Sequence, residues 1–154
     1  MTLVVWRIVQ PRFAHVAFSG EGARRFGGRW NSPGRRVIYN AQSQSLAALE
    51  MLVHFDSEIL LQQYLAIPVT IPSRLILQLP LSFLPKNWTE YPAPLSTRSI
   101  GDNWIEAASS AVLQIPSAVI PSESIFLLNP SHPQFKKVRI GKTSRFQFDP
   151  CLSR

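Results

Sequence analysis

Apolar and polar residues alternate along much of the chain in a way that predicts a mixed α+β fold. Residues 2–9 are β-branched and aromatic, which is typical of a strand, and Arg7 is the one charge among them. Residues 12–29 contain four glycines and are predicted to form a loop, as are the Pro-rich residues 81–96. Further segments of strand character occupy residues 35–40, 63–71, 74–79, 118–120, 124–128, 138–142 and 146–148.

Two segments show helical periodicity. The first begins at a capping serine, Ser43 or Ser45, and runs to about Phe55. It is apolar around most of its circumference, so we expect it to be buried on most sides, and Glu50 is its one carboxylate. A second helix is predicted within residues 97–114, starting near the Gly-Asp pair in that segment and ending before a proline.

Length and composition indicate one globular domain spanning residues 1–154. Hydrophobic residues make up 45% of the chain, enough to build a core without disulfide bonds. The single cysteine, Cys151, excludes a disulfide framework and favours a reducing, cytoplasmic setting. No apolar run approaches the roughly 18 residues of a membrane span, and the N-terminal segment lacks the order of a signal peptide.

Positive charge is concentrated near the N-terminus. Residues 1–40 hold seven arginines and one acid, so their charge is 7 − 1 = +6, whereas the net charge of the whole chain is +7. Residues 41–154 hold nine basic and eight acidic residues, or 9 − 8 = +1. The planar fork of arginine suits phosphate and carboxylate, so an anionic ligand or partner is predicted.

Arg29 and Glu50 are the two charged residues whose surroundings point to a site. Arg29 follows Gly27 and Gly28, where unhindered backbone amides and a guanidinium can converge on a diphosphate; the alternative is a solvated arginine. Glu50 lies in an apolar helix and must be paired, protonated or at the rim of a cavity. It is either a structural ion pair with an arginine or a carboxylate that faces developing positive charge.

Three further side chains are candidates for supporting roles. Tyr39 is either a core residue of its strand or a platform on which a flat ring stacks. His54 is expected to be a supporting or core histidine and not a base. Ser117 follows a proline at a break between elements, where its hydroxyl can be held rigidly. His15 and His132 lack metal-type spacing, so no metal site is expected.

A nucleic-acid interface is the main alternative of another class. The basic segment 12–36 interleaves arginines with Phe26 and Trp30, a pattern that fits phosphate contacts and base stacking. No helix-turn-helix, RRM or zinc pattern accompanies it, and it leaves Glu50 unexplained. The glycines show neither the dinucleotide-fold nor the P-loop spacing.

Six segments in order along the chain carry a family resemblance. They are GGRWN (27–31), VIY (37–39), SLAALEMLVH (45–54), GDNW (101–104), IPSAVIP (115–121) and NPSHPQF (129–135). Together they resemble the RES domain family, the toxin half of bacterial RES–Xre type II toxin–antitoxin modules. The three residues that give the family its name match Arg29, Glu50 and Ser117.

The resemblance implies an ADP-ribosyltransferase-like fold, with a split β-core and flanking helices, and NAD+ as substrate with no further cofactor. It implies that Arg29 holds the diphosphate or ribose and that Tyr39 stacks near nicotinamide. Glu50 would stabilise positive charge at the anomeric carbon, and Ser117 would support Glu50 or contact the ribose. Gly28, and Arg7 in the first strand, are the further expected NAD+ contacts.

The resemblance also implies an activity and a partner. The expected reaction is cleavage of the nicotinamide N-glycosidic bond with water or phosphate as acceptor; protein ADP-ribosylation by the same site is the alternative. The expected partner is an Xre-family helix-turn-helix antitoxin that covers the Arg-rich entrance. Nucleic acid would be contacted only through the antitoxin, within a complex that can contain a toxin dimer, and no membrane would be involved.

Overall fold

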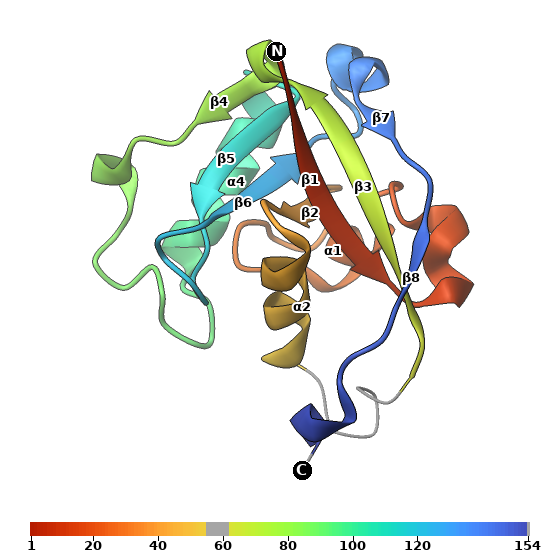
Figure 1. The fold of residues 1–154 in the computed structure, drawn as a ribbon. Coiled ribbons are helices and arrows are strands. Elements are labelled where there is room, and N and C mark those ends of the chain that lie inside the picture. The colour runs from red at the N-terminus through yellow and green to blue at the C-terminus, as the bar shows by residue number, and fades with distance from the viewer. Residues whose placement is uncertain (55–61, 154) are drawn as a thin grey trace.

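The strand β1 (Thr2–Val9) lies inside a curled eight-stranded sheet in the computed structural model, which describes residues 1–54 and 62–153 (Figure 1). The sheet order is β4-β5-β6-β2-β1-β3-β7, and β8 also pairs with β3. The other strands are β2 (Ile38–Ala41), β3 (Tyr64–Pro72), β4 (Ile76–Gln78), β5 (Val112–Pro116), β6 (Ser124–Leu128), β7 (Arg139–Ile140) and β8 (Ser144–Phe146).

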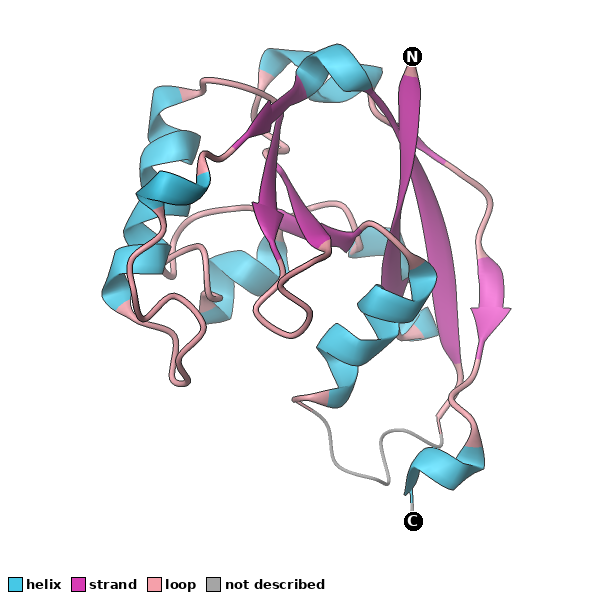
Figure 2. Cartoon of the chain, turned by 60° about the vertical axis from the view of Figure 1, so that its left-hand side comes forward, coloured by secondary structure: helices cyan, strands magenta, loops and turns pink. Residues whose placement is uncertain are grey.

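The sheet is nearly divided between β1 and β2. These two strands share one register pair, Trp6 with Ala41, whereas β1 and β3 share eight. One half therefore consists of β4, β5, β6 and β2, and the other of β1, β3, β7 and β8. Figures 1 and 2 show the halves set at an angle, with the longer helices on the flanks. The predicted α+β class with a split β-core is confirmed.

The helix α2 (Gln44–Leu52) packs against β1 and β2. Its predicted serine cap is confirmed, because the Ser43 hydroxyl accepts a hydrogen bond from the Leu46 amide at 3.1 Å. The predicted extension to Phe55 falls outside the described residues. Within them, the helix is followed directly by Val53 in helical conformation.

The expectation that α2 is buried on most sides is confirmed except on one face, where Ser45 and Leu49 are exposed. Its buried side chains are Leu46, Ala47 and Ala48, while Leu49 is 38% and Val53 56% exposed. Met51 and Leu52 are partly buried and pack against the main core. The exposed apolar residues Leu49 and Val53 lie one helical turn apart, on the outer face of the helix.

The helix α4 (Leu95–Ala107) is shorter and earlier than the predicted 97–114. It ends where Ala108 adopts a left-handed conformation with φ of 50°. Residues from Val112 onward form β5 instead, fully paired with β6. The predicted helix was wrong there because pairing and complete burial of this apolar run outweigh its local helical pattern.

The loop predicted for residues 12–29 is wrong in part. It contains the helix α1 (Glu21–Phe26), bounded by Gly20 and Gly27, both with positive φ.

The segment 118–120 is a turn and not a strand, closed by a 2.8 Å bond from the Ser117 amide to the Glu123 carbonyl. The short 3-10 helices are η1 (Pro11–Val16), η2 (Ser73–Leu75), η3 (Leu81–Phe83), η4 (Pro133–Lys137) and η5 (Pro150–Ser153).

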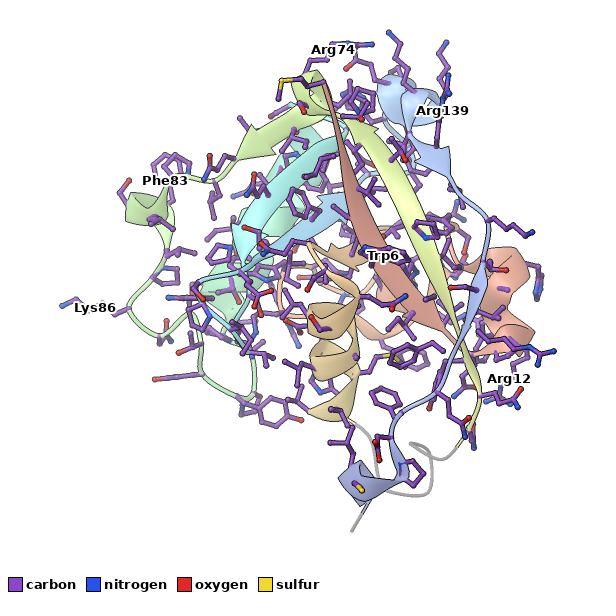
Figure 3. The ribbon with its side chains drawn as sticks, viewed as in Figure 1. Trp6, Arg12, Arg74, Phe83, Lys86 and Arg139 are labelled. Atoms are coloured by element: carbon purple, nitrogen blue, oxygen red, sulfur yellow. The ribbon has the colours of Figure 1, made fainter. Side chains whose placement is uncertain are left out.

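The main hydrophobic core lies between the sheet, α2 and α4, and a second core covers the opposite side of the sheet. Figure 3 shows Trp6 in the middle of the molecule, whereas the labelled basic side chains point outward from it. None of the helices in the described part of the chain is long and apolar enough to cross a membrane.

Candidate active site

Glu50 and Ser117 meet although 67 positions separate them. The Ser117 hydroxyl donates a hydrogen bond of 2.6 Å to Oε1 of Glu50. Glu50 comes from the second half of α2, and Ser117 directly follows β5. The packing of α2 on β1 and β2 and the turn that follows β5 thus bring the two predicted residues together.

The Ser117 hydroxyl is fully engaged. Its oxygen accepts hydrogen bonds of 3.1 Å from the amides of Val119 and Ile120, and the residue is completely buried. A serine hydroxyl has one proton to donate and two acceptor positions. Since both acceptor positions are filled by amides, the proton is directed at Glu50. This geometry makes Ser117 a fixed support for the carboxylate.

Glu50 is half-buried, and its support comes from a hydroxyl and not from a cation. The ion pairs within residues 1–54 and 62–153 are Arg24–Glu21, Arg36–Glu21 and Arg35–Glu106. The alternative of a structural ion pair with an arginine is therefore wrong for this part of the chain. His54 is exposed, so it is not a core histidine either.

Tyr39 is anchored through its hydroxyl. It donates to Oδ1 of Asn31 at 2.5 Å and accepts from the Trp30 amide at 3.2 Å. Burial raises the pKa of Tyr39 far above its ordinary value, so the phenol stays neutral. A Cβ at Gly28 would lie 2.6 Å from the tyrosine hydroxyl, so this position requires glycine to admit Tyr39. Contact of Gly28 with NAD+ stays a prediction.

Arg29 is held by hydrogen bonds at both its guanidinium and its main-chain carbonyl. Its Nη1 atom donates to the carbonyls of Trp88 and Glu90 at 2.9 and 2.7 Å. Its own carbonyl accepts a 2.7 Å bond from the Thr97 hydroxyl in α4. Arg29 thus ties the loop before α4 to the Gly-Gly turn, and the remaining N–H groups of the guanidinium are the ones that a ligand can use.

Arg7 is a half-buried cation without a carboxylate partner in the described structure. Its Nη1 donates to the Tyr39 carbonyl at 2.9 Å, and its enclosed Nε has no hydrogen-bond partner among the described residues. Burial lowers the pKa of Arg7 to about 10, which leaves the group charged at neutral pH. A partly enclosed guanidinium without a carboxylate partner suits an anionic ligand.

The predicted residues form two groups that border one core. Glu50 and Ser117 are in direct contact, while Arg7 bonds to the backbone of Tyr39 and Gly28 lies against its ring hydroxyl. Tyr39 packs against the same hydrophobic cluster as the buried side of α2. The arrangement offers a supported carboxylate and cations without acidic partners, which suits a ligand that carries both anionic groups and a positive centre.

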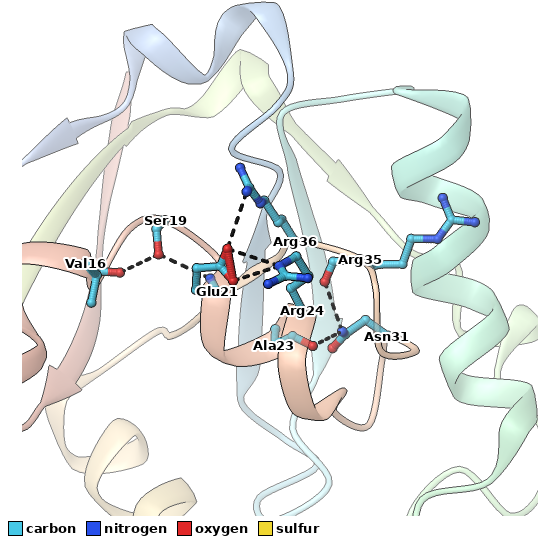
Figure 4. Close-up of polar contacts among 8 residues, drawn as sticks. All are labelled: Val16, Ser19, Glu21, Ala23, Arg24, Asn31, Arg35 and Arg36. Atoms are coloured by element: carbon cyan, nitrogen blue, oxygen red, sulfur yellow. Dashed lines mark hydrogen bonds and ion pairs between the residues drawn. The ribbon is translucent and has the colours of Figure 1, made fainter.

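Asn31 and Asp102 are supporting residues that the sequence did not single out. Asn31 is fully buried, and its amide donates to the carbonyls of Ala23 and Arg35 (Figure 4). It also donates to the Ser32 carbonyl at 3.1 Å. Asp102 accepts a 2.9 Å bond from the Ser32 amide. Both residues lie in segments that carry the family resemblance, and this resemblance is the signal in the sequence that could have identified them.

The basic segment is less suited to nucleic acid than its sequence indicates. Trp30 is 2% exposed and cannot stack on a base, although Phe26 is 79% exposed. Arg24 and Arg36 share the Glu21 carboxylate (Figure 4). The prediction that Trp30 belongs to an exposed surface of aromatic and basic side chains is therefore wrong.

Two open hollows lie on the described surface. One, of about 110 Å³, borders the site at Pro116 and extends along Glu123 and Ser124. The other, of about 500 Å³, lies between η1 and the segment around Ile140. The larger hollow shares no lining residue with the predicted site. The polar contacts of Glu50, Ser117 and the arginines therefore identify the site better than cavity size does.

Comparison with protein families gives a match that spans nearly the whole chain. The RES domain family profile covers residues 4–149. The predicted residues Arg7, Arg29, Tyr39, Glu50 and Ser117 all lie inside it.

Sequence relatives agree with this match. The chain is 38% identical over 151 residues to Toxin Res of Yersinia enterocolitica, covering 97% of this chain and 99% of that protein. It is 34% identical over 160 residues to the Prs ADP-ribosylating toxin of a Sphingobium strain, covering 100% and 99%.

The fold also has a solved counterpart. A chain in the crystal structure of the M. tuberculosis MbcT–MbcA toxin–antitoxin complex superimposes with a TM-score of 0.76, over 99% of this chain and 87% of that one. At 19% identity the likeness shows a shared fold.

Proposed function

The chain belongs to the RES domain family, and from this premise we propose that it is the toxin of a bacterial toxin–antitoxin module and acts by consuming NAD+. The observation that carries the proposal is the 2.6 Å hydrogen bond from Ser117 to Glu50. It gives a half-buried carboxylate a fixed orientation without neutralising it. Such a group is suited to stabilise positive charge that develops in a reaction.

The proposed reaction breaks the bond between the ribose anomeric carbon and the nicotinamide nitrogen. Nicotinamide leaves with the bonding electron pair as a neutral molecule, and positive charge develops on the ribose ring. Glu50 faces that charge. Water or phosphate then adds to the anomeric carbon, and in the hydrolytic case the products are ADP-ribose, nicotinamide and one proton.

The remaining predicted residues hold the substrate in this proposal. Arg7 and Arg29 have guanidinium N–H groups available for the diphosphate, and Arg7 has no carboxylate partner in the described structure. Tyr39 presents a half-buried neutral ring beside Gly28 for the nicotinamide end.

Substitution of the carboxylate tests the proposal. Purified Glu50→Gln is expected to consume NAD+ at least about 100-fold more slowly than the parent, because it removes the charge that opposes the developing cation. In cells, the parent lowers NAD+ and arrests growth, and the variant does neither. Glu106→Gln, which removes a surface carboxylate paired with Arg35, is the matched control and retains activity. Growth arrest by the parent with an unchanged NAD+ level contradicts the proposal.

Protein ADP-ribosylation is the second candidate, favoured by the name of the Sphingobium relative. It uses the same residues and differs only in the acceptor. NAD+ labelled in its adenylate half separates the two reactions: label on a protein band indicates transfer, whereas free ADP-ribose or its 1″-phosphate indicates hydrolysis or phosphorolysis.

The proposed partner is an Xre-family antitoxin that covers the arginine-rich entrance. The likeness to a chain from a toxin–antitoxin complex supports an antitoxin partner in general. Co-expression with a helix-turn-helix protein encoded beside this chain tests it: a stable complex with suppressed NAD+ consumption is expected. Recovery of two free proteins with full activity contradicts the proposed partner.

A further inference from the structure

The helix α4 runs along the turn that carries Arg29, and three contacts fix its position there. The Thr97 hydroxyl bonds to the Arg29 carbonyl at 2.7 Å. Gly101 lies so close to Trp30 that a Cβ would stand 1.6 Å from the Trp30 carbonyl oxygen. Further along, Asp102 accepts from the Ser32 amide. The N-terminal part of α4 is thus rigidly placed beside the proposed site.

Arg98 lies on this anchored side of α4. It is next to Thr97 and one helical turn before Asp102, so its side chain shares the flank that faces the Arg29 turn. The side chain is half-buried, and its Nε atom is enclosed without a hydrogen-bond partner among the described residues. Burial and the charge of Asp102 raise the pKa of Tyr39, whereas the charges of Arg98 and Arg29 lower it, so all three charged groups lie within electrostatic reach of the tyrosine.

The surroundings of Arg98 favour an anion. Neither Arg98 nor Arg29 forms an ion pair in the described part of the chain. Arg98 also lies near the N-terminal end of α4, the positive end of the helix dipole, where a cation is disfavoured. Asp102 is the acid one helical turn away, and its carboxylate accepts from the Ser32 amide and pairs with neither arginine. The two guanidinium groups therefore keep their charge unpaired, and the unsatisfied buried N–H of Arg98 has a further cost.

Arg29 alone is poorly placed to supply all of the phosphate contacts. One of its terminal nitrogens already serves two loop carbonyls. Arg98 has no such commitment among the described residues, and its planar fork is suited to bidentate contact with phosphate oxygens. The two side chains complement each other, one holding the loop in place and the other free to bind.

We propose that Arg98, together with Arg29, forms a phosphoryl-binding subsite at the start of α4. The inference rests on the proposed function for the identity of the ligand, which is the diphosphate of NAD+. The same chemistry would also bind inorganic phosphate as the acceptor. Arg98 is a substrate-binding residue in this assignment, and Glu50 and Ser117 keep their roles.

Titration calorimetry with pyrophosphate, alongside steady-state kinetics with NAD+, tests the subsite. Arg98→Gln is expected to weaken pyrophosphate binding by about tenfold or more, the loss typical of a charge-assisted bond. It should raise the KM for NAD+ by a similar factor while kcat changes little. Arg98→Lys keeps the charge but lacks the planar fork, so its pyrophosphate affinity and its KM for NAD+ should lie between those of the parent and those of Arg98→Gln. Arg139→Gln, an exposed arginine on the far edge of the sheet, is the control and should match the parent (Figure 3).

The outcomes separate the subsite from the proposed function. A parent that binds pyrophosphate through Arg98 but leaves NAD+ intact supports the subsite and overturns the proposed function. If Arg98→Gln raises only the KM for inorganic phosphate, the subsite binds the phosphate acceptor and not the diphosphate of NAD+. Unchanged pyrophosphate, phosphate and NAD+ constants in folded Arg98→Gln overturn the subsite. If that variant does not fold, as judged by thermal melting, the same constants in Arg98→Lys decide.

Discussion

Ser117 orients Glu50 with a hydroxyl whose three hydrogen-bonding positions are all in use. Ser117→Ala removes the donor to Glu50 and leaves two amides in a buried turn without their acceptor. We expect a loss of about 1–3 kcal/mol in the free energy of unfolding from the unsatisfied amides. We also expect kcat for NAD+ to fall about 10-fold or more with little change in KM, because the carboxylate loses its orientation.

Ser110→Ala is the control for this variant. The Ser110 hydroxyl accepts from Trp104 at 2.9 Å and donates to the Val112 carbonyl, and it touches none of the site residues. It should lose stability while keeping kcat. Equal effects of the two substitutions on kcat would mean that Ser117 acts only on the fold.

At the level of single residues, the sequence identified Glu50 from its isolation among apolar neighbours. It did not identify the partner of Glu50 by any spacing rule, because a separation of 67 positions depends on the topology of the sheet. The position of Ser117 after a proline indicated a rigidly held hydroxyl, and the family resemblance assigned it to the site of Glu50. Arg98 was missed because it is one of sixteen basic residues, and only its enclosure distinguishes it.

Among the elements, α1 depends on Glu21, whose carboxylate accepts from Arg24 and lies 3.4 Å from Arg36 (Figure 4). The bond from Arg24 holds the pKa of Glu21 below its ordinary value. A carboxyl with a depressed folded-state pKa stabilises the protein above its unfolded pKa, and this contribution is lost as pH falls through the folded value. Glu21→Gln should therefore melt slightly below the parent at pH 7.

The difference should vanish in acid. As pH falls through the lowered pKa of Glu21, the parent carboxyl becomes protonated, so the melting curves of parent and variant should converge. The effect at neutral pH is expected to be small because the pair is solvent-exposed. Glu90→Gln, which removes an exposed carboxylate outside the described ion pairs, should melt like the parent throughout. A gap between Glu21→Gln and the parent that widens in acid would contradict the assigned role.

Local pattern was a good guide to some elements and a poor one to others. The bounds predicted for β1 and β6 match the structure, because both are apolar, β-rich runs. α1 was missed because six residues that include a glycine carry too little periodicity to register as a helix. The start of β5 was assigned to a helix because its partner β6 lies further along the chain, and pairing cannot be read from local periodicity.

Over the whole molecule, the C-terminal segment completes the main core. Phe148 is 4% exposed and packs edge-to-face against Tyr64 and Phe146, with ring centroids 5.7 and 5.0 Å apart. Phe148→Ala should cost about 3–5 kcal/mol and lower Tm by about 10 °C. Phe83→Ala, at a position 65% exposed, is the control for loss of a phenyl ring (Figure 3). Equal melting of the two variants would contradict this role.

The order of strands in the sheet was beyond local reasoning. β2 pairs with β6, and β4 runs parallel to β5, although long stretches of sequence separate the members of each pair. The sequence predicted that strands exist, and the family resemblance predicted a split core. Which strands meet at the single Trp6–Ala41 pair is decided by the packing of the whole chain.

The long separation between Glu50 and Ser117 also has a consequence during synthesis. A ribosome that has translated the first hundred residues has made α2 but neither Ser117 nor β6, the strand on which β2 pairs. A nascent or prematurely terminated chain of that length lacks both the support of the carboxylate and half of the sheet. Under the proposed function, a chain that ends before Ser117 should therefore not consume NAD+, and activity should arise only after the ribosome has passed Ser117 and β6.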